Sequence, residues 1–138
     1  MKLNFRKIIT LKNLIIIVSI AIFLVVFRHF VHKSERNFVD NINKNKVFVY
    51  GCIDHSYQPA DGPVMMKYHF YFKGHLYEKE QSFPNVYDKF VKNKFLVILD
   101  STNPKKNHML IFPYDFEKFN LKFPDSLKWV NQMWNVSL

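Results

Sequence analysis

Cys52, Asp54 and His55 form the most reactive group of side chains in the sequence, because all three fall within one short segment. A thiol beside an imidazole can act as an activated nucleophile, and thiol, carboxylate and imidazole groups are all zinc ligands. A strand, however, would place Cys52 and Asp54 on one face and His55 on the other. The chain has a single cysteine, so the usual zinc ligand set is incomplete. We expect a strand end with a small buried thiol. An enzyme that uses Cys52 and His55 is the alternative.

His29 and His32 are three positions apart in a segment that we expect to be helical, so they share one helix face. Such a pair can hold a metal or respond to pH. Their position beside an apolar segment instead indicates a polar flank. His69, His75 and His108 are scattered over predicted strands, and the sequence leaves open whether folding brings them together.

Glu78 and Glu80 have the two-residue spacing that places both carboxylates on one face of a strand, where such a pair can serve as acid and base. The facing strand supplies Lys67 and His69, so we expect both acids to be cross-strand partners of these side chains. The three glycines form no phosphate-binding loop, and no serine nucleophile motif occurs. We predict no catalytic, cofactor-binding or metal-binding residues.

Aromatic residues are concentrated in the second part of the chain, where 19 of the 24 lie beyond residue 46. The rings of residues 68–72 could stack on bases, but this role requires exposed rings beside a positively charged groove. The net charge of +9 resides mainly in residues 1–46, which contain nine Lys/Arg and two Asp/Glu, whereas residues 47–138 contain eleven and nine. We therefore expect a ring-filled core and no nucleic-acid or small-molecule partner. A cytoplasm-facing nucleic-acid-binding module is the alternative.

Residues 14–27 form an uncharged segment in which all but one residue are apolar. A helix of this length spans about 21 Å, less than the about 30 Å of a bilayer core. Apolar neighbours lengthen the span to residues 8–31, with Lys12 and Arg28 near its rims, where basic side chains reach the headgroups. No small-x-small cleavage motif follows Phe27, so we predict an uncleaved signal anchor.

Basic residues flank both ends of this segment in nearly equal number, so the positive-inside rule gives only a small bias. A short basic N-terminus tends to stay inside while a larger domain is carried across. We expect a single-pass protein of a bacterial inner membrane with a cytoplasmic N-terminus and an extracytoplasmic C-terminal domain. The expected partners are the lipid bilayer and an envelope protein.

The chain is expected to have three parts. Residues 1–40 form a basic flank, a membrane helix and its extension to about Phe38, residues 41–46 form a polar linker, and residues 47–138 form the domain. The predicted fold is thus an N-terminal transmembrane helix followed by a small, mostly β (α+β) domain with antiparallel hairpins and a short C-terminal helix.

The clearest local signal in the domain is the alternation of side chains over residues 64–72, which is typical of a half-buried strand. A turn at Lys73 and Gly74, with a positive φ at the glycine, closes a hairpin that sets ring against ring and charge against charge. The predicted pairs are Phe72–His75, Phe70–Tyr77, His69–Glu78 and Lys67–Glu80.

Further elements follow from local patterns along the domain. Strands are expected at 47–50, 95–99 and 109–112, a loop at 54–63, a turn at 100–104, and a turn or short helix over 84–93 with Val86, Phe90 and Tyr87 facing inward. A helix begins near Pro124, with Leu127, Val130 and Trp134 on one face. Trp129 and Trp134 either close the core, which we favour, or contact a bilayer.

Several motifs of the domain resemble a family of small bacterial single-pass membrane-anchored proteins with a compact β-rich domain of unknown function. The motifs are Tyr68-x-Phe70-x-Phe72-x-Gly74-x-x-Tyr77, Tyr87-Asp88-Lys89-Phe90, and Asp100-Ser101-Thr102-Asn103-Pro104-Lys105 with Leu110 beyond. Relatives often carry Tyr-Asp-Pro where this chain has Leu99-Asp100-Ser101. The resemblance covers residues 47–112 and implies an anchored β domain, without implying any catalytic residue. We expect a non-enzymatic interaction or accessory module of the cell envelope.

Overall fold

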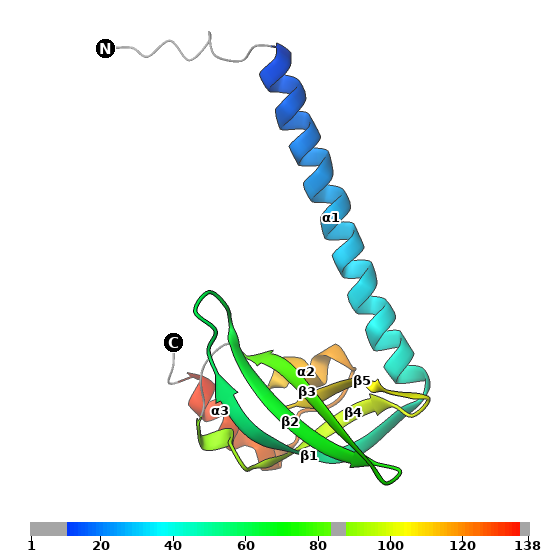
Figure 1. Cartoon of the computed structure of the whole chain (residues 1–138), viewed down its shortest axis with the longest axis vertical. Coiled ribbons are helices and arrows are strands. Elements are labelled where there is room, and N and C mark those ends of the chain that lie inside the picture. Colours follow the sequence, from blue (N-terminus) through cyan, green and yellow to red (C-terminus); the bar gives the residue numbers. More distant parts are fainter. Residues whose placement is uncertain (1–10, 84–87, 136–138) are drawn as a thin grey trace, which may run out of the picture. The chain divides into compact units, whose positions relative to one another are not determined.

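The structure, a computed structural model, describes residues 11–83 and 88–135. It consists of a long apolar helix, a five-stranded antiparallel sheet and a short C-terminal helix, which confirms the predicted α+β fold (Figure 1). The chain forms two compact units that meet between Asn37 and Phe38.

The first unit contains most of helix α1 (Leu11–Lys44). The side chains of residues 14–27 are all exposed, and those of Phe23 and Phe27 stack on one another with ring centroids 6.1 Å apart. This is the one helix of the described chain that is long and apolar enough to cross a membrane.

The end of α1 corrects the predicted linker. The helix continues to Lys44 rather than ending near Phe38, and β1 begins at Lys46, so residues 41–46 are mostly the last helical turn. Ile42 is fully buried in this turn, and Phe38 packs on Phe119 with ring centroids 6.5 Å apart. Ile42, together with Phe38 and Val39, holds this end of the helix against the domain by removing apolar side chains from water.

Five strands form one sheet in the order β3-β2-β1-β4-β5, with every pairing antiparallel (Figure 1). Their bounds are β1 (Lys46–Tyr57), β2 (Val64–Phe72), β3 (His75–Phe83), β4 (Lys94–Asp100) and β5 (Asn103–Leu110). The edge strands β3 and β5 consequently run parallel to each other across the opening of a near-barrel. This succession of strands is that of the five-stranded OB-type barrel, a likeness of architecture that carries no function.

The side chain of Gln81 bridges this opening. Its Oε1 accepts a hydrogen bond from the Met109 backbone N–H at 2.9 Å, and its Nε2 donates to the Met109 carbonyl at 3.1 Å. The Gln81 amide thereby binds both backbone groups of Met109 on β5, as a neighbouring strand would. At a second point Lys79 donates to the carbonyl of Lys105 at 3.4 Å.

The β2–β3 hairpin has the predicted register, including the Phe70–Tyr77 and Lys67–Glu80 pairs. The rings of Phe70 and Tyr77 stack at 5.4 Å between centroids. Lys73 and Gly74 both have positive φ, 50° and 77°, which is the type I′ pattern that matches the twist of the strands.

Strand β1 is longer than predicted, since it reaches Tyr57 and leaves only residues 58–63 as a loop. Its polar second half pairs with β2 through backbone hydrogen bonds, which the side-chain pattern does not reveal. The register shifts between Ile53 and His55, so Asp54 is the extra residue of a β-bulge.

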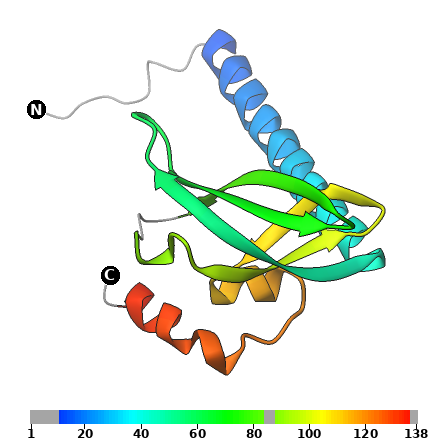
Figure 2. The same ribbon diagram turned by 60° about the horizontal axis from the view of Figure 1, so that its bottom comes forward.

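The remaining elements lie near predicted positions, except for the helix at Pro113–Lys118, which was not predicted. They are η2 (Asp88–Phe90), α2 (Pro113–Lys118), η3 (Asp125–Leu127) and α3 (Lys128–Asn135), and both α-helices lie below the strands in Figure 2. Strand β5 starts at Asn103 and ends at Leu110, so the predicted turn is shorter and residues 111–112 lead into α2. Val86, Tyr87 and the Trp134 side chain fall outside the described residues.

Buried side chains form two clusters, one on each side of β4. The inner cluster fills the near-barrel and includes Tyr68, Phe70, Phe90 and Val97. The second joins Ile42, Ile98, Leu110, Phe116 and Phe119 between the sheet, α2 and the end of α1. Because β4 contributes to both clusters, its residues are apolar on both faces, as the sequence indicates.

Gly51 lies where β1 crosses the inner cluster, and we expect Gly51→Ala to destabilise the domain by about 1–3 kcal/mol through overpacking. A Cβ there would lie 2.8 Å from Val97 Cγ2 and 3.1 Å from the carbonyl oxygen of His69. Thermal unfolding of the full chain in detergent, followed by near-ultraviolet circular dichroism, measures the loss. Gly62→Ala is the control, because the nearest atoms to its Cβ belong to Pro59 at 3.5 Å. Equal melting temperatures for both variants would refute the overpacking.

Candidate functional site

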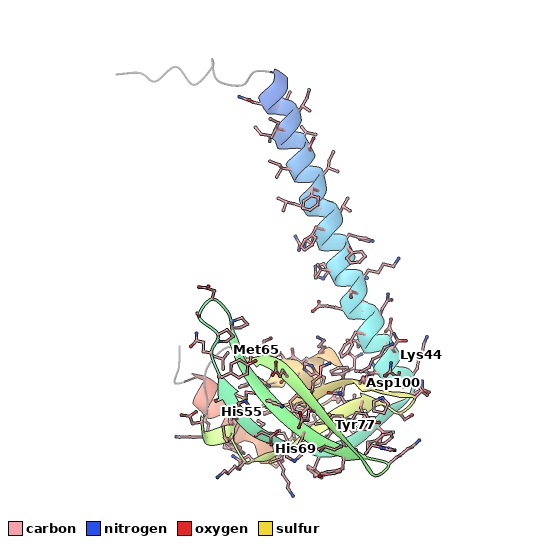
Figure 3. The ribbon with its side chains drawn as sticks, in the orientation of Figure 1. Lys44, His55, Met65, His69, Tyr77 and Asp100 are labelled. Atoms are coloured by element: carbon pink, nitrogen blue, oxygen red, sulfur yellow. The ribbon has the colours of Figure 1, made fainter. Side chains whose placement is uncertain are left out.

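The candidate site is the outer face of β1, β2 and β3, opposite the inner cluster. We define this outer face by the outward residues of the three strands, which are Lys46, Phe48, Tyr50 and Cys52 on β1, Met65, Lys67, His69 and Tyr71 on β2, and Leu76, Glu78 and Glu80 on β3. Figure 3 labels Met65 and His69 on β2 and His55 on β1.

A side-chain hydrogen bond joins β1 to β2 on this face. Asp54 Oδ1 lies 2.7 Å from His69 Nδ1, and each side chain is one-third exposed, at 33%. Strand alternation already places Asp54 on the face of Cys52, and the bulge sets His55 rather than Asp54 opposite Lys67. A carboxylate bound to an imidazole in this way fixes the orientation of the ring and favours the tautomer with a proton on Nδ1.

The bulge also changes the predicted relation between Asp54 and His55. Strict alternation would set them on opposite faces, yet both line one open hollow of about 340 Å³ on the outer face. The ring of His55 packs against Tyr57, with centroids 5.9 Å apart. The hollow is also lined by Lys67, His69, Tyr71, Leu76 and Glu78.

Cys52 faces His69 across the β1–β2 ladder, so the imidazole that the fold brings beside the thiol is not that of His55. The thiol is half-buried rather than buried, and its Sγ contacts the Ile53 carbonyl at 3.9 Å. No hydrogen bond joins this thiol to an imidazole within the described chain. The imidazole nearest to the thiol along the ladder is therefore that of His69 rather than His55.

The backbone register of Glu78 and Glu80 is the predicted one, but their side chains contact other partners than the predicted His69 and Lys67. Lys67 Nζ lies 2.9 Å from Glu78 Oε2, whereas Glu80 accepts a hydrogen bond from the Tyr57 hydroxyl at 3.1 Å. The hydrogen bond from Lys67 lowers the pKa of Glu78, and the same contact raises the pKa of Lys67. The bond to Glu80 raises the pKa of Tyr57.

Lys67→Met should return the pKa of Glu78 toward its ordinary value, because it removes the donor and the charge that hold it down. The lowered pKa of Glu78 means that this contact stabilises the fold above the unfolded-state pKa and is lost as pH falls through the folded pKa. Lys67 has a raised pKa, so its contribution is lost only as alkaline pH passes that value. NMR titration of the Glu78 carboxyl carbon measures the shift. Lys79→Met is the matched control, and an unchanged Glu78 titration in Lys67→Met would contradict the assignment.

Of the other histidines of the domain, His75 and His108 do not belong to the outer face. His29 and His32 are exposed on α1, and His75 is exposed beside the hairpin turn. His108 belongs to an inner network, where its Nε2 lies 2.8 Å from Asp115 Oδ1. Within the described ranges, no three His, Cys, Asp or Glu side chains gather closely enough to hold a metal ion.

A row of exposed apolar side chains crosses the outer face beside the hollow. Tyr71 faces Leu76, Tyr50 faces Leu96, and the pairing of Gly51 with Phe70 makes Tyr50 and Tyr71 neighbours. Tyr50 is 72% exposed, Tyr71 63% and Leu76 50%. The alternation over residues 64–72 already separates the outward Tyr71 from the inward Phe70, but the exposed row that Tyr71 forms with Tyr50 and Leu76 was not predicted.

Trp129 is the other partly exposed ring of note, and it lies at the edge of the inner cluster. Its ring contacts those of Phe90 and Phe95, with centroids 5.7 and 6.4 Å apart. Trp129 therefore closes one end of the core, as favoured from the sequence.

Comparison of the chain with protein-family models, curated proteins and solved structures finds no match. The site itself must therefore carry the functional inference.

Proposed function

We propose that this chain is a non-enzymatic, single-pass membrane-anchored protein whose β-rich domain is an interaction module in a bacterial cell envelope. The observation that carries the proposal is the exposed, uncharged surface of α1 over residues 14–27. A monomeric soluble protein rarely leaves so long an apolar surface in water, whereas a bilayer covers it.

The outer face supports interaction rather than turnover. Its charged side chains contact each other, as in Asp54 with His69 and Lys67 with Glu78, so they stabilise the sheet. The hydrogen bond that the Cys52 thiol makes in the described chain goes to the Ile53 carbonyl rather than to an imidazole. Exposed tyrosines on a rigid sheet are, by contrast, typical contact residues of interfaces.

Replacing Ile20 and Leu24 by lysine tests the anchor. Each lysine near the middle of a membrane helix costs about 2.5–3.5 kcal/mol of insertion free energy, so we expect the double variant to leave the membrane fraction. Flotation and carbonate extraction measure the distribution of the full chain. The double alanine variant at the same positions should remain with the membranes. Extraction of the unchanged protein by carbonate would refute the anchor.

The orientation and the partner need separate measurements. The first uses a reporter that is active only outside the cytoplasm. Fused after Leu138, it should be active, because a cytoplasmic N-terminus and a single span place the C-terminus outside. Photo-crosslinking from Tyr71 in the full chain should trap an envelope component. Turnover of a substrate that requires Cys52 would overturn the non-enzymatic assignment.

A further inference from the structure

The turns of α1 that follow the proposed span carry their basic side chains on one side of the helix. At about 100° per residue, the five basic residues among positions 28–36 lie within about 140° of the helix circumference. The apolar Phe30 and Val31 lie at the same level outside this sector, and they are 70% and 41% exposed. We call the sector the basic arc and define it by Arg28, His29, His32, Lys33 and Arg36.

Positive charge predominates in the basic arc. All five of its side chains are exposed, and Arg28, Lys33 and Arg36 make no ion pair within the described residues. Glu35, at the border of the arc, is the only acid among positions 28–36. The next acid, Asp40, lies about 18 Å beyond Arg28 along the helix axis, at about 1.5 Å per residue. The arc is therefore a surface that attracts anions.

The basic arc lies at headgroup depth because it continues the helix that forms the span. About 20 helical residues ending at Phe27 cross the hydrocarbon core of about 30 Å, and each headgroup layer adds about 5–8 Å. The rise of about 1.5 Å per residue places positions 28–33 in this layer. Arg36 begins further out, but helical side chains lean toward the N-terminus of their helix, which is here the bilayer side. The span and positions 28–36 belong to one compact unit, so their depth does not depend on where the β domain lies.

The side chains of the basic arc are suited to bind phosphodiester groups. A guanidinium, as in Arg28 and Arg36, binds two oxygens of one phosphate, and the Lys33 ammonium adds a positive charge. The imidazoles of His29 and His32 each offer an N–H donor even when they are neutral. The phosphate of phosphatidylcholine is neutralised by its own quaternary ammonium, whereas that of phosphatidylglycerol is not. The arc should therefore prefer the anionic lipid.

We propose that the basic arc binds the phosphate groups of anionic phospholipids and so gathers these lipids on one side of α1. This inference rests on the proposed anchor and deepens it by naming the class of lipid that the anchor selects. It holds for either orientation of the chain across the membrane, because the arc lies at the same depth in both.

Spin-labelled lipids measure this selectivity in the full-length protein. The protein is reconstituted into phosphatidylcholine vesicles with a trace of spin-labelled phosphatidylglycerol or phosphatidylcholine, and electron paramagnetic resonance gives the fraction of each lipid that the protein immobilises. We expect the association constant of phosphatidylglycerol to exceed that of phosphatidylcholine several-fold. The triple variant Arg28→Gln, Lys33→Gln and Arg36→Gln should lose most of this preference, because each basic residue near the surface adds to the attraction of anionic lipid.

An exchange of Lys33 and Ser34 is the matched test of the one-sided arrangement. The double variant Lys33→Ser and Ser34→Lys keeps the net charge and changes the depth of the cation by one residue only. It turns the cation by about 100°, out of the basic arc. We expect the preference for phosphatidylglycerol to fall, and an unchanged preference would overturn the arc as the binding site.

The possible outcomes separate lipid selection from the anchor. Equal immobilisation of both labelled lipids would overturn the selection and leave the anchor intact, whereas protein that immobilises neither lipid would overturn the anchor itself. Inorganic phosphate that replaces chloride at equal ionic strength should leave the preference unchanged. Loss of the preference under this condition would assign the basic arc to a soluble anion and so overturn the lipid as its ligand. Near-ultraviolet circular dichroism confirms that the β domain of each variant is folded.

Discussion

Asp115→Ala should destabilise the domain by about 3–5 kcal/mol, the cost of removing one partner from a buried charged network. Asp115 is 1% exposed, and its Oδ2 accepts the backbone N–H groups of Ile111 and Phe112 at 3.1 and 2.9 Å. Its Oδ1 lies 2.8 Å from His108 Nε2. Alanine would leave all three groups without this acceptor in the interior and would remove a negative charge from the first turn of α2.

Thermal unfolding of the full chain in detergent measures the effect of this substitution. In a domain of about 100 residues, each 1 kcal/mol lowers the melting temperature by about 4–8 °C. Asp115→Asn should lose less, since its amide oxygen can still accept one or both backbone N–H groups. Asp125→Ala is the control, because that carboxylate is exposed and pairs only with Lys128 in the described chain. Similar losses for Asp115→Ala and Asp125→Ala would refute the role of the network.

The hairpin of β2 and β3 could be predicted in full because its register depends on neighbouring residues. Phe70 must face Tyr77 for the rings to share the core, and a one-residue slip would expose them. The turn at Lys73 and Gly74 fixes the same register independently. The side-chain pattern and the turn geometry agree in this hairpin, so the side-chain pattern alone is sufficient to predict its register.

The pairing of β1 with β2 could not be predicted, although it builds the candidate site. Asp54 and His69 are fifteen residues apart, and their contact requires that β1 and β2 pair across the loop of residues 58–63. No side-chain pattern encodes a bulge. The same shift brings Asp54 and His55 to one hollow, where simple alternation predicts opposite faces.

The end of α1, at the boundary between anchor and domain, could not be predicted from the local sequence either. Residues 41–46 are polar except for Ile42, which is indistinguishable in sequence from an isolated apolar residue of a linker. Its burial depends on Phe116 and Phe119, which lie far along the chain. Local composition therefore indicates a linker where tertiary packing extends the helix.

Ile42→Ala should destabilise the domain by about 2–5 kcal/mol, because it removes buried methyl groups and leaves a cavity between α1, β4 and α2. Ile42 has no exposed surface and packs in one cluster with Ile98 and Phe119. Had these residues formed a linker, the same change would cost almost nothing. Thermal unfolding of the full chain, followed by near-ultraviolet circular dichroism, distinguishes the two cases.

Ile20→Ala is the matched control for this experiment, since it makes the same chemical change in the same helix at a side chain that is 54% exposed. It should leave the melting temperature of the domain unchanged. Ile42→Val should lose only about 0.5–1.5 kcal/mol, because most of the buried volume is kept. A graded loss from valine to alanine at residue 42, with none at residue 20, would place the end of α1 in the folding unit of the domain. Equal melting temperatures for Ile42→Ala and Ile20→Ala would instead indicate that residues 41–46 form a flexible linker.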